Sequence, residues 1–412
     1  MIVDAFLEWA EQAPRERRVE AADALARSYL HSPLGDDERR KVMTGLFALL
    51  DDQSIDVRER IADVFADRRD APRPLVLRLI DDVPAVSTLL FARSPLLHDT
   101  HLLEGLQRAE PRIEQAIASR IGLTEALVNA ILSDAGSKAC CALVGNPHVR
   151  LGDSQTLHFI DRFAGDVEAL ETLQATRNLP PEHLCLLVSA AAQAYQENTF
   201  VQALVPEKRL NRLTDAARER AILDVLMQLD SKGCYRAIGA LYPVGGLTPA
   251  LVLRVALCGQ VPALEAMVAR LCDVSMERVR SAFMHSRPVV AASLLKKTGL
   301  SEPVCSVISM ALVMARELAG AQVDWTPAFF AETLIEVVDQ RSAQALYEDV
   351  AGALPDDATV GLCHSIAADI MQAEARSQAL PQQAVEFDLD SVLDVDSTGA
   401  NVDALMSEAL AA

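Results

Sequence analysis

The sequence predicts an all-α fold in which helical hairpins stack into an α-solenoid. Alanine and leucine, which favour helices most strongly, dominate a chain of 412 residues that is 50% hydrophobic and 4% aromatic. An apolar helical run ends in an arginine or an asparagine, followed by turn residues, at four places that lie 27, 26 and 31 residues apart: Arg93, Arg120, Asn146 and Arg177. A period of this length is typical of stacked helical repeats, in which each hairpin buries its apolar face against its neighbours.

The N-terminal region, residues 1–197, divides into helical pairs. Two helices are expected within residues 1–35, and Asp36-Asp37 then supplies acidic caps for the next helix. The segment Ile55-Asp56-Val57-Arg58 is similar to the Asp-x-x-Val-Arg start of the second helix in a HEAT repeat, so we expect HEAT-like repeats here. Further pairs are expected at 72–80 with 84–92, 99–108 with 110–120, 124–133 with 136–144, and 153–163 with 166–176, followed by a helix at 181–194.

Residues 198–214 interrupt this rhythm, because Pro206 and three cations are mixed with apolar residues. We expect an irregular linker there, followed by a second helical-repeat region at 215–376. Thr248 is a candidate N-cap in that region, and Pro249 suits the first helical position. Helices are expected at 216–229, 231–240, 248–257, 260–271, 275–284 and 287–298, and three longer helices at 302–318, 327–352 and 356–376 are expected to cap the stack.

The C-terminal segment, residues 377–412, differs in composition from the rest of the chain. It has no Lys or Arg, and its acidic residues alternate with apolar ones such as Phe387 and Leu393. We expect a disordered acidic tail that carries one or two short linear motifs; a plain solubilising tail, or one that folds back onto its own solenoid, are the alternatives. The acidic residues of the tail are Glu386, Asp388, Asp390, Asp394, Asp396, Asp403 and Glu408.

The net charge and the cysteine content limit which partners and which cellular compartment are expected. The formal net charge is −20, which repels phosphate, so we expect neither nucleic acid nor an anionic membrane surface as a partner. The eight cysteines form no C-x-x-C motif and lie mostly in apolar runs, which indicates buried thiols in a reducing compartment. The start Met1-Ile2-Val3-Asp4 lacks a basic region, and no run of 18 apolar residues occurs. A cytoplasmic protein without membrane insertion is expected.

A group of segments in the second half resembles a known family. These are residues 247–259, which end in Ala-Leu-Cys-Gly, together with 264–271, Val274, Arg278-Val279 and 294–300. With the N-terminal repeats, they resemble an uncharacterised family of alphaproteobacterial HEAT-like proteins, a domain of unknown function, over roughly residues 35–320. The resemblance implies an all-helical cytoplasmic bacterial protein and supplies no catalytic residues. Where the family is expected to carry an aromatic pair after Gly259, this chain has Pro262-Ala263-Leu264.

The periodic residues Arg93, Arg120, Asn146 and Arg177 are the first candidate binding site. Equivalent positions in a solenoid form a ladder on one surface, where guanidinium groups suit a carboxylate or a phosphate. The alternative is structural: a polar residue at a helix C-terminus satisfies carbonyls that have no partner within the helix. The two interpretations differ in what the side chains contact, an open groove or the backbone.

The second candidate is a cationic stretch at Lys208, Arg209 and Arg212, which is expected to dock the acidic tail or to be a solvated helix face. No motif for phosphate binding, serine hydrolysis or zinc proteolysis occurs, so we expect no catalytic residues and no cofactor. His98 and His101 have helical spacing but no third ligand nearby, so no metal is expected.

These observations favour a non-catalytic scaffold or adaptor that binds a protein partner through a helical-repeat groove and is regulated by its acidic tail. The first alternative is a receptor for a small anionic, nucleotide-like ligand held by the arginine ladder. The second is an enzyme, since some HEAT-like solenoids resemble DNA glycosylases. The net charge of −20 and the presence of only two tryptophans, Trp9 and Trp325, argue against the enzyme.

Overall fold

The computed structural model describes residues 8–9, 12–284, 288–345 and 355–379, and this part of the chain contains helices and no strands. The chain divides into two compact units, Met1–Asn178 and Leu179–Ala412. The all-α prediction is therefore confirmed. The acidic residues of the expected tail, from Glu386 to Glu408, lie outside the described residues.

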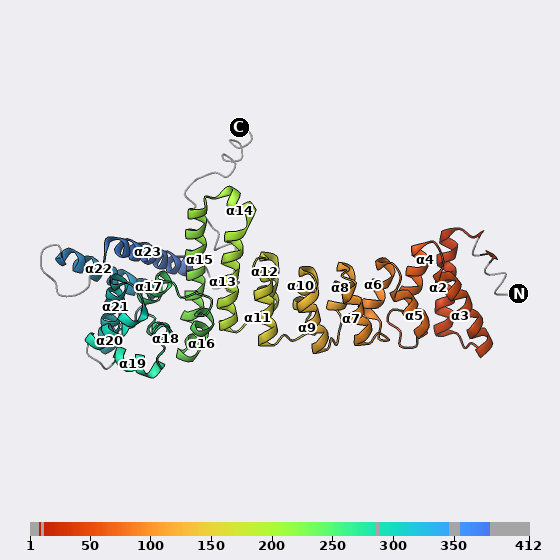
Figure 1. Cartoon of the computed structure of the whole chain (residues 1–412), viewed down its shortest axis with the longest axis horizontal. Helices are drawn as coiled ribbons and strands as arrows, with labels where there is room; N and C mark the ends of the chain where they lie inside the picture. Colours follow the sequence, from red (N-terminus) through yellow and green to blue (C-terminus); the bar gives the residue numbers. More distant parts are fainter. Residues whose placement is uncertain (1–7, 10–11, 285–287, 346–354, 380–412) are drawn as a thin grey trace, which may run out of the picture. The chain divides into compact units, whose positions relative to one another are not determined.

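Unit 1 is built from successive helix pairs that contact only near neighbours (Figure 1). The even-numbered helices form one continuous layer, because α2 contacts α4, α4 contacts α6, and the series continues to α12. Each of these helices therefore packs mainly against helices close to it in the sequence. The helices are α2 (Arg15–His31), α3 (Asp36–Leu50), α4 (Ile55–Phe65), α5 (Arg73–Ile80), α6 (Pro84–Arg93), α7 (Asp99–Gln107), α8 (Pro111–Ala118), α9 (Glu125–Asp134), α10 (Ser137–Gly145), α11 (Asp153–Arg162) and α12 (Val167–Thr176).

Local sequence explains where these short helices begin. Proline occupies the first turn of α5, α6 and α8, where its missing N–H costs nothing. The side chains of Thr124 and Asp166 accept hydrogen bonds from the first turns of α9 and α12. Each helix then buries one face, and the large side chains of Phe65, Phe91 and Phe159 are fully buried between the pairs. The helical pairs expected from residue 36 to 176 are present with boundaries that shift by up to three residues.

Unit 2 begins earlier than the sequence suggests. Helix α13 (Pro181–Glu197) packs against α15 (Glu207–Met227) and α16 (Ser231–Leu241), so it belongs to the second unit. The interval 198–214, expected to be an irregular linker, is largely helical: it contains α14 (Thr199–Leu204) and the first two turns of α15. The apolar pattern fails there because these turns leave most of their residues exposed, not because the helix is missing.

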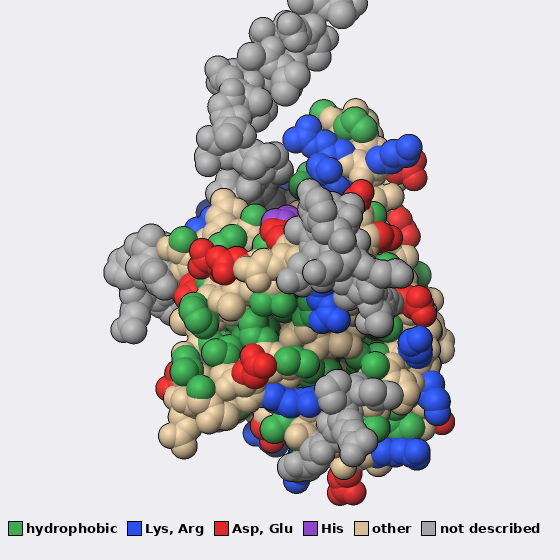
Figure 2. All heavy atoms as spheres, turned by 90° about the vertical axis from the view of Figure 1, so that its left-hand side faces the viewer, with side chains coloured by type: hydrophobic (Ala, Val, Ile, Leu, Met, Phe, Trp, Pro, Cys, Tyr) green, Lys and Arg blue, Asp and Glu red, His purple; other side chains and the backbone are tan. Residues whose placement is uncertain are grey.

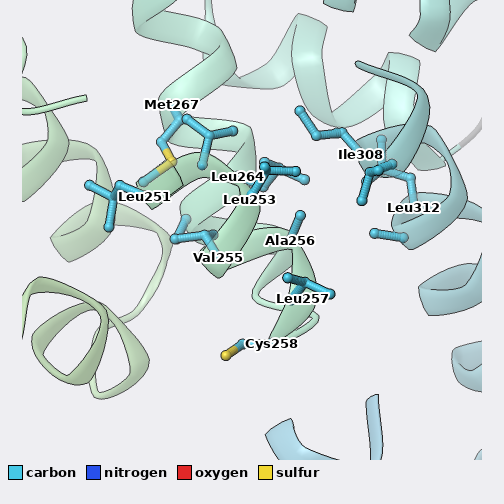
Figure 3. Packing of buried hydrophobic residues seen from close by; sticks show 14 of the residues in the cluster. Leu251, Leu253, Val255, Ala256, Leu257, Cys258, Leu264, Met267, Ile308 and Leu312 are labelled. Carbon is cyan, nitrogen blue, oxygen red and sulfur yellow. The ribbon is translucent and has the colours of Figure 1, made fainter. Parts of the chain in front are cut away.

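Helix α17 (Pro249–Leu257) is the centre of unit 2. Every residue from Leu251 to Leu257 is buried, and α17 contacts α15, α18, α21, α22 and α23. In Figure 3, Leu253 and Leu257 of α17 pack beside Ile308 and Leu312 of α21 and Leu264 of α18. The surrounding helices are α18 (Val261–Leu271), α19 (Met276–Met284), α20 (Pro288–Leu295), α21 (Glu302–Gly320), α22 (Pro327–Ala345) and α23 (Asp357–Ala379). The last three therefore enclose a core helix instead of capping the end of a linear stack.

Among the described residues, one helix, α21, is long and apolar enough to cross a bilayer by length and composition. Half of its apolar window is buried inside unit 2, against α17, α20 and α22. A buried core helix passes the same test, and the packing of α21 is that of a core helix.

Candidate functional site

The periodic polar residues connect successive helix pairs of unit 1. Arg120, just after α8, donates from Nη1 to the Phe91 carbonyl at 2.7 Å and from Nη2 to the Ser94 carbonyl at 2.8 Å, at the end of α6. Asn146, just after α10, donates to the carbonyls of Ala118 and Arg120 at 3.0 and 2.8 Å. Each side chain thus satisfies carbonyls that the preceding helix of the layer leaves without an intrahelical partner.

Arg177 continues the series after α12, because its three guanidinium nitrogens donate to the carbonyls of Val144, Asn146 and Val149 at 2.7 to 3.1 Å. Burial lowers the pKa of both Arg120 and Arg177. Their donors point into the backbone of the neighbouring repeat, so these positions act as caps between repeats.

Arg93, the first member of the series, differs from the others. It forms ion pairs with Asp63 at 2.7 Å and Asp67 at 3.3 Å, at the C-terminal end of α4, and its side chain is 38% exposed. The four residues predicted as one binding ladder therefore hold the layer of even-numbered helices together: three through carbonyls and one through carboxylates.

Replacing Asn146 by Ala tests this capping role. The side chain is 5% exposed, so its loss leaves two carbonyls without a donor and is expected to lower the free energy of unfolding by about 1–3 kcal/mol. Urea unfolding followed by circular dichroism measures the change. Arg150→Ala, at an exposed position in the same unit, is the control and should change stability by at most about 0.5 kcal/mol. Equal effects of the two substitutions would contradict the capping role.

His98 and His101 lie at the start of α7, where the backbone N–H of His98 donates to Nδ1 of His101 at 3.2 Å. The His101 imidazole thus caps the N-terminus of α7. Within the residues that the structure describes, no three His, Cys, Asp or Glu side chains gather closely enough to hold a metal ion.

The cysteines are free thiols placed mostly in the two cores. Burial raises the pKa of the Cys185 and Cys258 thiols to about 12, far from the range in which a thiolate attacks. Six are buried, and only Cys141 and Cys272 are partly exposed.

In the native protein at pH 8, we therefore expect a thiol reagent to modify at most Cys141 and Cys272, whereas all eight cysteines should react after unfolding. Mass spectrometry of the alkylated protein identifies the sites. Rapid modification of Cys258 in the folded chain would show that the core is open where the structure has it closed.

The exposed surface formed by α14 and the start of α15 is the main candidate for a partner site. Helix α14 buries none of its residues: Phe200 is 72% exposed and Leu204 is 67% exposed. Leu213, on the second turn of α15, is also exposed. An exposed apolar patch marks an interaction site more often than single exposed side chains do, and these three side chains lie within one short stretch of the chain. We call these residues, with the cations described next, the α14–α15 surface.

Three cations accompany these apolar side chains. Lys208, Arg209 and Arg212 are exposed on the first two turns of α15, and none has an ion-pair partner among the described residues. In Figure 2, hydrophobic and cationic side chains lie together at the top of the view, at the height where Figure 1 places α14. The sequence analysis gave these cations as a tail-docking site or a solvated helix face. They are exposed, and tail docking stays a prediction. The exposed apolar side chains in the same stretch were not part of that prediction.

The α14–α15 surface is held in place by polar contacts around it. Asn198 Oδ1 accepts hydrogen bonds from the N–H groups of Phe200 and Val201, which starts α14. Gln196, at the end of α13, donates to Thr214 Oγ1 at 2.7 Å and to Asp215 Oδ1 at 3.2 Å, which ties α13 to α15. The surface is thus presented on a fixed helical support.

A buried charge cluster anchors α15 to the centre of unit 2. Arg254 of α17 is 2% exposed and donates from Nη2 to Asp369 of α23 at 3.1 Å, while its Nε lies 4.0 Å from Glu219 of α15. Arg220 adds a second ion pair to Asp369 at 3.4 Å, and Thr248 donates to Glu219 at 2.6 Å. Burial raises the pKa of Glu219. The sequence analysis missed this cluster, because Asp369 lies 115 residues from Arg254 in the chain.

Comparison with known proteins gives a family but no close relative of established activity. No curated protein and no solved structure matches the chain. A family model with the description "Uncharacterised protein conserved in bacteria (DUF2336)" matches residues 86–348, which include the second half of unit 1, the α14–α15 surface and the centre of unit 2. The match confirms the resemblance to an uncharacterised bacterial family. Because it covers more than half of the 412 residues, the chain belongs to this family.

Proposed function

We propose that this protein is a non-catalytic adaptor that binds an acidic, apolar segment of a protein partner on the α14–α15 surface. The observation that carries the proposal is the exposure of Phe200 and Leu204 in the same stretch of chain as the exposed cations Lys208, Arg209 and Arg212. Apolar side chains supply the burial that drives association, while exposed cations favour an acidic partner and increase the rate of encounter.

The location of these cations strengthens the proposal. The chain carries a net charge of −20, so most of its surface repels an acidic partner. A surface on which cations outnumber acids is the exception. Between residues 198 and 214 there are three cations and one acid, Glu207. An acidic segment is therefore attracted locally and repelled elsewhere, which gives specificity as well as affinity.

The chain itself contains a segment of the required chemistry. Residues 377–412 hold seven acids, no cations, and apolar residues such as Phe387 and Leu393. We propose that this tail competes with the partner for the α14–α15 surface, since a tethered segment benefits from a high effective concentration. Release of the tail by a partner would then regulate binding.

The contacts of the periodic residues do not support the alternative of a small anionic ligand there. Backbone carbonyls accept the side-chain hydrogen bonds of Arg120, Asn146 and Arg177, and two aspartates pair with Arg93. An anion at these positions would have to displace those bonds. The enzyme alternative gains no support from the geometry of the described residues either.

Affinity capture from the native bacterium tests the adaptor proposal. The bait is the full-length chain, compared with a charge variant, Arg209→Glu with Arg212→Glu, and an apolar variant, Phe200→Ser with Leu204→Ser. We expect at least one protein to be captured by the wild type and lost from both variants, because each removes one half of the recognition chemistry.

A matched control separates this effect from a general change in charge. Arg112→Glu with Arg150→Glu reverses two exposed cations of unit 1 and should retain the same captured proteins. If the set of captured proteins is identical for the wild type, both surface variants and the control, the α14–α15 surface is not the binding site.

A further inference from the structure

A second feature, separate from the α14–α15 surface, is a cavity of about 590 Å³ inside unit 2. Its walls come from the turn between α17 and α18, from α19 and α21, and from the segment that precedes α22. Most of the lining side chains are apolar, and Val261, Phe283, Leu312 and Trp325 are among them. The volume and the apolar lining fall in the range of small-molecule sites.

Among the described residues, one charged side chain of the cavity lining has no ion-pair partner. Arg316, on α21, has its Nε buried without a hydrogen-bond partner, and no ion pair of Arg316 occurs among the described residues. The other two charged side chains of the lining compensate each other, because Arg280 Nε lies 3.1 Å from Glu265 Oε2. Only Nε is buried without a partner, so the terminal guanidinium nitrogens remain accessible and can donate to an anion that enters the cavity.

Gly259 shapes another part of the cavity lining. This residue has φ +65, and a Cβ atom there would lie 2.8 Å from both Trp325 Nε1 and Phe330 Cδ2. The missing side chain lets Trp325 approach the turn after α17, with its ring tilted against that of Phe330 at a centroid distance of 5.7 Å. The expected aromatic pair after Gly259 is absent, and aromatic groups reach the same region from the segment before α22 and from α19 instead.

We propose that this cavity binds an amphipathic monoanion: a molecule with an apolar body and one carboxylate or phosphate group. The apolar body lies against Trp325, Phe283 and Leu312, and the anionic group accepts hydrogen bonds from Arg316. The guanidinium fork suits either head group in a bidentate arrangement. The inference is independent of the adaptor function, because the lining residues and the α14–α15 surface have no residue in common.

Three ten-carbon probes test the proposal on the full-length protein: decanoate, decyl phosphate and decanol, all below their aggregation concentrations. Isothermal titration gives the affinity, and the fluorescence of Trp325 in a Trp9→Phe background reports on the cavity itself. We expect at least one of the two anions to bind about tenfold or more tightly than decanol, because a charge-assisted hydrogen bond accounts for that ratio. Comparison of decanoate with decyl phosphate identifies the preferred head group.

Two variants and a control assign the binding to the cavity. Arg316→Gln should abolish the preference for the anion with little change in Tm, since no ion pair of Arg316 occurs among the described residues. Ala319→Trp fills the cavity from an exposed position on α21 and should abolish binding of all probes. Arg278→Gln, an exposed position on α19 outside the lining, should bind as the wild type does.

Three results would overturn the proposal. They are equal affinity for decanol and both anions, unchanged anion affinity in Arg316→Gln, and the absence of binding by either anion.

Discussion

In the Arg254→Ala variant, the free energy of unfolding of unit 2 is expected to fall by about 3–5 kcal/mol. Arg254 is 2% exposed and is the cation on which Asp369 and Glu219 converge from two other helices. Without Arg254, the carboxylates of Asp369 and Glu219 have less positive charge nearby to offset the cost of their burial. The substitution also removes a contact that joins α15, α17 and α23. Removing one charged residue from a buried ion cluster is among the most destabilising single substitutions.

Arg236→Ala is the matched control for this prediction. Its ion pair with Glu182 spans 3.5 Å, but the Arg236 side chain is 64% exposed, so its loss should cost at most about 1 kcal/mol. Urea unfolding of both variants, followed by circular dichroism, measures the difference. Similar losses for Arg254→Ala and Arg236→Ala would mean that the buried cluster does not hold unit 2 together.

Gly259→Ala is expected to destabilise unit 2 by about 2–5 kcal/mol. The left-handed backbone of Gly259 costs an L-residue about 1–2 kcal/mol. The added Cβ also meets Trp325 Nε1 and Phe330 Cδ2 at 2.8 Å, and such overpacking costs about a further 1–3 kcal/mol. Trp325 must move to relieve the contact, so its fluorescence emission should shift as well.

Gly245→Ala isolates the packing component of this effect. Gly245 has φ +70, close to that of Gly259, and nothing lies within 4 Å of a Cβ built on it. The variant should therefore lose only the backbone cost, about 1–2 kcal/mol, and leave Trp325 emission unchanged. If both glycine variants lose the same stability, Trp325 and Phe330 do not pack against Gly259.

Helix positions in unit 1 could be predicted from the sequence because the signals there are local. Prolines at first turns, caps such as Thr124 and Asp166, and apolar spacing within ten residues fix where each short helix starts and which face is buried. The periodic residues were also visible. What Asn146 contacts was not, because a period indicates equivalent positions and does not distinguish a groove from the backbone of the previous repeat.

Features that depend on contacts between residues far apart in the chain could not be predicted from the sequence pattern. Helix α13 continues the rhythm of unit 1, yet it packs against α15 and α16, so the boundary lies at 178–179 and not at 197–198. The charge cluster of Arg254 joins residues far apart in the chain. Arg316 gives no sequence signal at all: one arginine in an apolar helix looks the same whether it reaches water, a carboxylate or an empty cavity.

The α14–α15 surface lies between these cases. The break in rhythm at 198–214 was visible, and the cations were noted, but the exposure of Phe200 and Leu204 required the structure. An apolar residue in a short segment after a long helix is usually buried by the next element. Helix α14, by contrast, has no buried residues.

The most direct test of the account is whether the α14–α15 surface recognises an acidic, apolar segment. A fluorescent peptide of residues 380–412 is titrated with the chain ending at Ala379, and anisotropy is measured at several salt concentrations. We predict binding that weakens as salt rises, and that is about tenfold weaker for Arg209→Glu with Arg212→Glu but unchanged for Arg112→Glu with Arg150→Glu. Equal affinity for the two double variants, or no binding by the wild type, would contradict the account.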